Sequence, residues 1–187
     1  MSLSPAKSEI LAAMLLLDKP ERATQIAKEA EKEFPSVMMH IIGLTRMGYT
    51  TSPEKGLYNL TEKGKKALGI PEINSENAKT ILADIPQDKS FHFYAGLGKP
   101  LSLQARGLQD FCDKIPKVNS DSIDFHVSRG DFESWFAELG DVELAKKAAL
   151  LKEKKMVGEA LRKRLQDIVT NRCMALANVA GHTVSPE

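Results

Sequence analysis

Two histidines, His92 and His126, each stand among aromatic residues. Together with Arg129, Asp131 and Trp135 they combine a few polar groups with aromatic walls, which is the usual composition of a small-molecule pocket. The pattern therefore indicates a candidate ligand pocket that comprises His92, His126, Arg129 and Trp135. The alternative is ordinary core packing, with Asp131 as a helix cap, and we favour this alternative over a ligand site.

Sequence motifs that would indicate an enzyme are incomplete or missing. Gly96-Leu97-Gly98-Lys99 is similar to a phosphate loop, but Pro100 follows the lysine in place of Ser or Thr, and Phe93 replaces the leading glycine. The sequence has no nucleophile elbow, metal-binding helix pair or dinucleotide fingerprint. Cys112 and Cys173 are isolated, so we expect two reduced cysteines and neither a zinc site nor a disulfide framework. We therefore expect no enzyme, no metal and no cofactor.

The composition is that of an ordinary globular protein. Of 187 residues, 42% are hydrophobic and 27% charged, which is enough apolar material for one or two domains. The formal net charge of +1 gives no indication of nucleic acid or membrane as a partner. The sequence has no apolar run of membrane-spanning length and no basic leader before an apolar core. These features predict a cytoplasmic protein with no membrane partner.

Hydrophobic spacing predicts a compact set of elements in the first seventy residues. Ser4 and Pro5 favour the start of a helix that ends near residue 17, and a second helix begins near residue 23 and ends before Pro35. Ser36 is expected to cap a third helix that runs to residue 47. A β-hairpin follows, with strands near 49–51 and 57–60, and Thr61 caps a further short helix at 62–68.

This order of elements carries a resemblance to a known family. Residues 23–27 (Ala-Thr-Gln-Ile-Ala), 44–49 (Leu-Thr-Arg-Met-Gly-Tyr) and 58–64 (Tyr-Asn-Leu-Thr-Glu-Lys-Gly) resemble the winged-helix domains of archaeal MarR/PadR-type transcriptional regulators. The resemblance implies that residues 1–70 form a winged helix-turn-helix domain of three helices and a β-hairpin wing. It also implies that double-stranded DNA is the partner and transcription regulation the function.

In a winged helix, the third helix enters the major groove and the second crosses the DNA backbone. Val37, Ile41 and Leu44 recur at helical spacing and should face the core, so Arg46 is free to contact phosphate or guanine and His40 a base edge. The candidate DNA-binding residues are Thr24, Gln25, Ser36, Met39, His40, Gly43, Arg46 and, at the wing tip, Lys55.

The weak basicity of this segment keeps two alternatives open. Residues 1–70 hold ten basic and eight acidic residues, a net charge of +2, although affinity for DNA depends on phosphate neutralisation. The alternative for the residues of the third helix is a solvated helix face, over which we favour contact with DNA, whereas a solvated turn lysine is an equally good interpretation of Lys55. The main alternative function is a protein-interaction adaptor whose winged helix does not bind DNA.

Residues 71–88 are expected to form a connector with a short helix at about 76–83, capped by Ser75, and residues 89–187 a second, mostly helical domain. Helices are predicted at about 104–115, after Asp131, after Asp141 and at 157–179. Residues 76–175 resemble an archaeal domain of unknown function, on the segments 91–98, 125–135 and 139–145. This resemblance implies a mostly helical module with no established chemistry, and we expect the domain to sense a ligand, dimerise or dock a partner.

The last helix carries an apolar stripe of Val157, Leu161, Leu165, Ile168 and Leu176. Such a stripe packs either on its own domain or on a second copy, and we favour the second copy, which makes a homodimer through the C-terminal helix. The basic run 146–164 is interpreted as a solvated helix face, with a second nucleic-acid surface as the alternative. The fold class predicted overall is mainly α.

Overall fold

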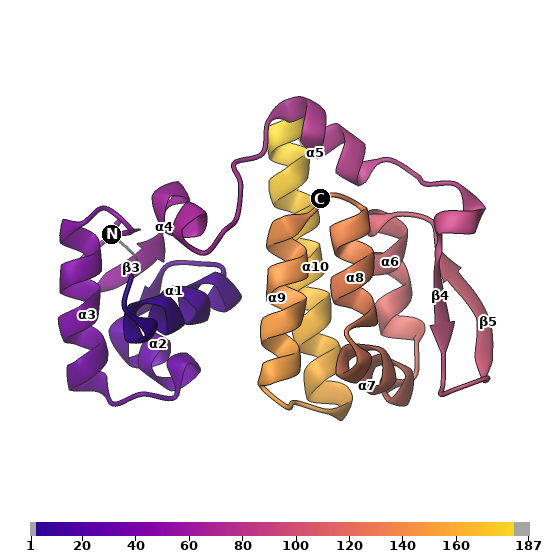
Figure 1. The fold of residues 1–187 in the computed structure, drawn as a ribbon, viewed down its shortest axis with the longest axis horizontal. Helices are drawn as coiled ribbons and strands as arrows, with labels where there is room; N and C mark the ends of the chain where they lie inside the picture. The colour runs from indigo at the N-terminus through magenta and orange to yellow at the C-terminus, as the bar shows by residue number, and fades with distance from the viewer. Residues whose placement is uncertain (1–2, 182–187) are drawn as a thin grey trace. The chain divides into compact units, whose positions relative to one another are not determined.

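The computed structural model describes residues 3–181 and divides the chain into two compact units, residues 1–72 and 73–187 (Figure 1). The described residues form ten α-helices, two short 3-10 helices and five short strands, so the protein is mainly helical, as expected. The strands form one three-stranded and one two-stranded antiparallel sheet. In the part of the chain that the structure describes, no helix combines the length and apolar character needed to cross a membrane.

The first unit follows the predicted order of three helices, a hairpin and a fourth helix, with one additional strand. Its helices and strands are α1 (Pro5–Leu17), β1 (Glu21–Arg22), α2 (Ala23–Ala30), α3 (Phe34–Arg46), β2 (Thr50–Thr51), β3 (Leu57–Leu60) and α4 (Glu62–Ala67). The three longer helices enclose a core that holds Ile10, Leu11, Met14, Ala23, Ile26, Ala27, Val37, Ile41 and Leu44. The apolar residues expected to face the core on α3 therefore do so.

The small sheet closes this core. β3 lies between β1 and β2 and is antiparallel to both, with Leu57 opposite Arg22 and Leu60 opposite Thr50. The β2–β3 hairpin is thereby tied to the chain between α1 and α2. Strand β1 has only two residues, too short to give a periodicity signal, which is why the sequence did not predict it.

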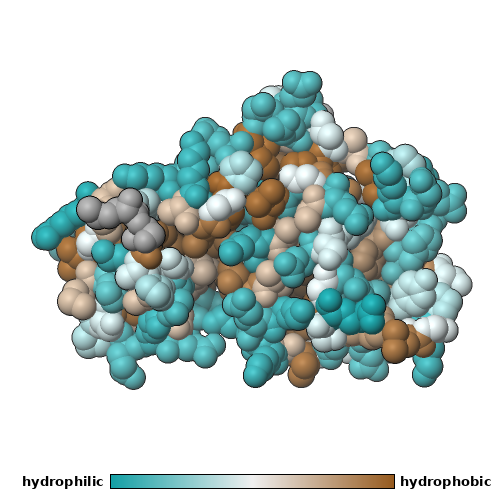
Figure 2. Space-filling view, in the orientation of Figure 1, coloured by the Kyte–Doolittle hydropathy of each residue, from teal (hydrophilic) through white to brown (hydrophobic). Residues whose placement is uncertain are grey.

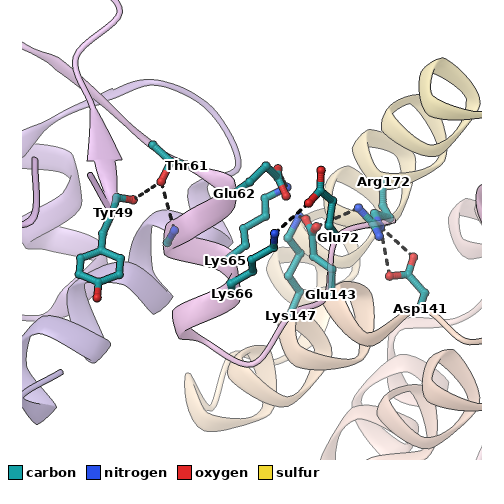
Figure 3. A network of polar contacts seen from close by, with 11 residues as sticks. Tyr49, Thr61, Glu62, Lys65, Lys66, Glu72, Asp141, Glu143, Lys147 and Arg172 are labelled. Atoms are coloured by element: carbon teal, nitrogen blue, oxygen red, sulfur yellow. Dashed lines mark hydrogen bonds and ion pairs between the residues drawn. The ribbon is translucent and has the colours of Figure 1, made fainter. Parts of the chain in front are cut away.

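A tight junction joins β3 to α4. Thr61 accepts a hydrogen bond from the Gly64 N–H at 3.1 Å, which caps α4 as predicted, and its hydroxyl lies 3.0 Å from the Tyr49 carbonyl oxygen. Figure 3 shows this contact. A Cβ placed on Gly64 would lie 2.3 Å from the Tyr49 oxygen, so only glycine allows α4 to approach this closely.

The second unit is a helical bundle with a hairpin on one side. Its helices and strands are α5 (Ser75–Leu82), η1 (Gln87–Lys89), β4 (Phe91–Tyr94), β5 (Pro100–Ala105), α6 (Leu108–Lys114), η2 (Ile115–Lys117), α7 (Ser120–Arg129), α8 (Asp131–Glu138), α9 (Val142–Glu153) and α10 (Gly158–Ala180). The helix expected within the connector, α5, belongs to this unit and packs on α10.

Aromatic rings fill the core between the hairpin and the helices. The Phe91 ring lies 4.9 Å from that of Phe132 and 5.4 Å from that of Trp135, and Phe111 packs on the same group at 5.2 Å from Phe132. Trp135 is buried and donates a hydrogen bond from its indole N–H to the Lys89 carbonyl at 3.1 Å. This polar contact lets a large amphipathic side chain enter the core without an unsatisfied donor.

Three expected helix starts are wrong. Helix α3 begins at Phe34 and contains Ser36 in its first turn, because Pro35 is compatible with that turn. Residues 104–105 belong to β5, and α6 begins only after Gly107, because Gln104 pairs with His92 of β4. Helix α5 is capped by Asn74, whose side chain accepts from the Asn77 N–H at 2.8 Å, and not by Ser75.

The interpretation of the α10 stripe as a face for a second copy is also wrong. Leu161, Leu165, Ile168 and Leu176 are at most 3% exposed, because α10 packs on α5, α6, α7 and α9 of its own unit. Val157, at the N-terminal end of the stripe, is 69% exposed. The stripe is therefore part of the core of the second unit.

Helices α9 and α10 are also joined by a buried ion cluster, shown in Figure 3. Arg172 binds Asp141 at 2.8 Å and Glu143 at 2.9 Å, and Lys147 binds Glu143 at 2.9 Å. Asp141 also caps α9, the helix predicted after it, by accepting a hydrogen bond from the Leu144 N–H at 3.0 Å. All four charged side chains are buried, so each depends on the others for compensation.

Candidate functional site

Helix α3 is fixed to the rest of the first unit from one side. Thr45 shares a 2.8 Å hydrogen bond with Thr50 of β2, and the Tyr58 hydroxyl of β3 lies 3.9 Å from the Met38 sulfur. The Lys63 ammonium of α4 donates to the Met47 carbonyl at 2.7 Å, just beyond the end of α3. These contacts hold α3 rigidly and leave its opposite face uncovered.

That uncovered face carries three of the eight predicted DNA-binding residues, and two more flank it. Met39, Gly43 and Arg46 recur at helical spacing, and Met39 is 64% exposed. No atom lies within 4 Å of a Cβ placed on Gly43, so another molecule can approach the α3 backbone there. Ser36 and His40 flank this face and are half-buried.

The remaining predicted residues lie on α2 and on the hairpin. Thr24 and Gln25 are exposed in the first turn of α2, where backbone N–H groups lack helical partners. Lys55 is exposed in the turn between β2 and β3, and the neighbouring Gly56 has a positive φ of 80°, which a tight turn favours in glycine. None of the eight predicted residues is buried.

The apolar character of this region was not predicted from the sequence. Ile42 and Met47 are 41% and 36% exposed on α3 or at its end, beside Met39. Figure 2 shows brown and pale surface among the teal at the edge of the first unit where α3 lies. Arg46 is the cation on α3 itself, so the face is more apolar than basic.

The second unit contains a pocket of about 300 Å³ between β4, the β4–β5 turn and α7. Three of the four residues predicted for a ligand pocket line it: His92, His126 and Arg129. The other lining residues are Phe91, Tyr94, Gly96, Leu97, Gly98, Phe125 and Asp131. Trp135 does not line the pocket and packs behind it, against Phe91.

His126 lines this pocket and is held in place by two hydrogen bonds. Its Nε2 accepts a hydrogen bond from the Tyr94 N–H at 2.9 Å, so its Nδ1 carries the proton and donates to the Asp131 carboxylate at 2.8 Å. Burial lowers the pKa of His126, although the hydrogen bond to Asp131 opposes this effect. Ser122 of α7 donates to the Tyr94 carbonyl at 2.7 Å, so this backbone oxygen of β4 has a hydrogen-bond partner.

This arrangement is that of a structural histidine with both nitrogens engaged. Asp131 is the first residue of α8 and binds His126 and Arg129, so the helix cap expected at Asp131 is wrong. Arg129 also lies over the Phe125 ring at 5.2 Å. The pocket therefore offers aromatic walls and a guanidinium group for binding, with no free general base at His126.

The basic run 146–164 is not one uniform face. Lys147 is fully buried against Glu143, and Arg162 binds Glu159 and the Pro116 carbonyl. Lys146, Lys152, Lys155 and Lys163 are exposed. The run thus combines structural cations with a solvated surface.

Comparisons with known protein families, with curated proteins and with solved structures find no match to this chain.

Proposed function

We propose that residues 1–72 form a winged-helix domain that binds double-stranded DNA, with α3 in the major groove and the β2–β3 hairpin as the wing. The observation that carries this proposal is the uncovered face of α3, on which Met39, Gly43 and Arg46 line up while the opposite face is fixed to β2 and β3. A rigid helix with one free face is what major-groove binding requires.

Six of the eight predicted residues have an assigned role in this proposal. Arg46 contacts a phosphate or a guanine edge, Met39 packs against a thymine methyl group, and Gly43 permits close approach of the helix backbone. Thr24 and Gln25 bring the N-terminus of α2 to a phosphate, because free N–H groups and the helix dipole favour an anion there. Lys55 extends phosphate contact from the wing tip.

The test is a polarisation titration of the full chain against a pool of fluorescent duplexes with randomised sequence, at about 50 and 200 mM salt. Binding should be tighter at the lower salt concentration. Arg46→Ala should weaken binding and reduce the salt slope by about one. Lys66→Ala is the matched control, because it removes one positive charge from α4, where Lys66 pairs with Glu72 at 2.8 Å.

A second candidate is a protein-interaction adaptor that uses the same face. The exposure of Met39, Ile42 and Met47 beside a single arginine favours it, because interface centres are enriched in methionine and depleted of charge. The titration separates the two functions. Absence of binding at the lower salt concentration, or equal behaviour of Arg46→Ala and Lys66→Ala, would exclude the DNA proposal and leave a protein as the occupant.

A further inference from the structure

The fold brings the two cysteines together although they are 61 residues apart. Cys112 lies on α6 and Cys173 on α10, and their sulfur atoms are 3.6 Å apart, both as free thiols. A disulfide needs a separation of about 2.05 Å, so small side-chain rotations would bring the sulfurs within bonding distance.

Both cysteines line one groove of the second unit. Cys112 and Cys173 are 8% and 6% exposed and lie in the wall of a groove of about 610 Å³ between α6, η2 and α10. Gln109, Asp113 and Thr170 also line the groove, so its wall is partly polar. A small hydrophilic molecule therefore fits beside the thiols.

The two thiols have different surroundings. The two sulfurs share one hydrogen bond, in which either can be the donor, and the Thr170 hydroxyl donates to Cys112 at 3.9 Å. Hydrogen bonding to Cys173 and Thr170 lowers the pKa of Cys112 although burial and the Asp113 carboxylate oppose it, and the hydrogen bond to Cys112 and burial raise the pKa of Cys173. Because the Thr170 hydroxyl can stabilise a thiolate at Cys112, we expect Cys112 to be the attacking sulfur.

We propose that Cys112 and Cys173 form a dithiol site that small disulfides oxidise by thiol–disulfide exchange. Cys112 gives up its proton and its thiolate attacks one sulfur of the small disulfide, so the S–S bond of that molecule breaks, a mixed disulfide forms and the expelled thiolate takes up the proton as the first small thiol. Cys173 then gives up its proton and attacks the Cys112 sulfur, so the mixed disulfide breaks, the protein disulfide closes and the second expelled thiolate takes up that proton. Two protein thiols are oxidised, and one small disulfide is reduced to two thiols.

Closing this bond would link α6 to α10 across a long loop. A cross-link over 61 residues restricts the unfolded chain, so oxidation should raise the thermal midpoint of the protein. Reduction with dithiothreitol should restore the original midpoint. This shift reports on the linkage independently of any DNA-binding function.

The experiment treats the native full-length chain with hydroxyethyl disulfide and follows it by intact mass and peptide mapping. The parent should lose two hydrogen atoms without an adduct and yield a linked Cys112–Cys173 peptide. Cys173→Ser should stop at a stable adduct on Cys112, whereas Cys112→Ser should react at least about tenfold more slowly. Thr170→Val should slow the first step, and Thr170→Ser should restore it.

Two results would overturn the proposal. One is a parent chain that carries stable adducts and never forms the linked peptide, which would show that the sulfurs cannot meet. The other is a native parent whose thiols react only after unfolding, which would show that the groove does not admit the disulfide. Both readouts use the parent protein, so they hold even if a cysteine variant folds poorly.

Discussion

Gly64 and Gly43 both lie in helices of the first unit but differ in the space around them. A Cβ on Gly64 would lie 2.3 Å from the Tyr49 oxygen and 2.6 Å from a methyl group of Leu60. A Cβ on Gly43 would meet nothing within 4 Å. Gly64→Ala should therefore cost at least about 1–3 kcal/mol of unfolding free energy. Gly43→Ala should stabilise the chain by up to about 1 kcal/mol, because alanine favours a helix.

Urea unfolding followed by circular dichroism measures both changes. The pair is informative because the substitution is identical and only the surroundings differ. A Gly64→Ala variant as stable as the parent would mean that α4 does not approach the Tyr49 carbonyl as closely as the structure places it.

His126 should make the second unit sensitive to acid. Burial lowers its pKa in the folded chain, so below about pH 6.5 the unfolded chain binds the proton more readily. The unfolding free energy should therefore fall as pH drops from about 7.5 to 5.5. His126→Asn should reduce this slope, and His92→Gln, which removes an exposed histidine from the same pocket, should preserve it.

Denaturant titrations at several pH values, followed through the single tryptophan, Trp135, supply the measurement. Since Trp135 is buried in the same aromatic cluster, its emission reports on this unit. Equal pH slopes in the parent and His126→Asn would contradict the assigned cause.

At the scale of elements, Arg172 holds α9 and α10 together through buried charges. Arg172→Met would leave Asp141 and Glu143 buried without their main counter-ion, so it should cost about 3–5 kcal/mol. Lys163→Met on the same helix removes an exposed cation and should change stability by less than about 0.5 kcal/mol. Thermal melts of both variants against the parent would reveal the difference, and similar midpoints would contradict the role of the cluster.

Local sequence patterns predicted the features that depend on residues close together in the chain. The core residues of α3, the cap at Thr61 and the helix after Asp141 follow from spacing and side-chain chemistry, and each is found where expected. The start of α6 was missed, because the apolar spacing after Gln104 fits a helix while pairing with β4 draws residues 104–105 into a strand. Strand pairing is a non-local effect that periodicity does not report.

The candidate sites also combine features that local spacing predicts with contacts that depend on the folded chain. The outward residues of α3 follow from helical spacing, and all of them are at least partly accessible. The contacts of His126 with Tyr94 and Asp131 and the meeting of Cys112 with Cys173 join residues from separate elements. The packing of α7 on β4 and α8 and the packing of α6 on α10 bring them together, and residue spacing alone does not report such packing.

At the scale of the whole molecule, the burial of the α10 stripe means that these residues are not available as a dimer interface. A homodimer stays compatible with the proposed DNA binding, because a second copy would read a second half-site, but it would have to use another surface. Deletion of the last helix is also no test of a dimer, because it would remove core residues Leu161, Leu165, Ile168 and Leu176.

Two substitutions on the same stripe give a sharper test. Leu165 is 1% exposed and Val157 is 69% exposed, so Leu165→Glu places a charge in the core and Val157→Glu places one in solvent. Leu165→Glu should destabilise the second unit by several kcal/mol at any protein concentration, because a buried charge without a partner is costly. Val157→Glu should match the parent in both stability and mass by sedimentation equilibrium. A Leu165→Glu protein that stays folded and sediments at half the mass of the parent would restore the stripe as a dimer interface.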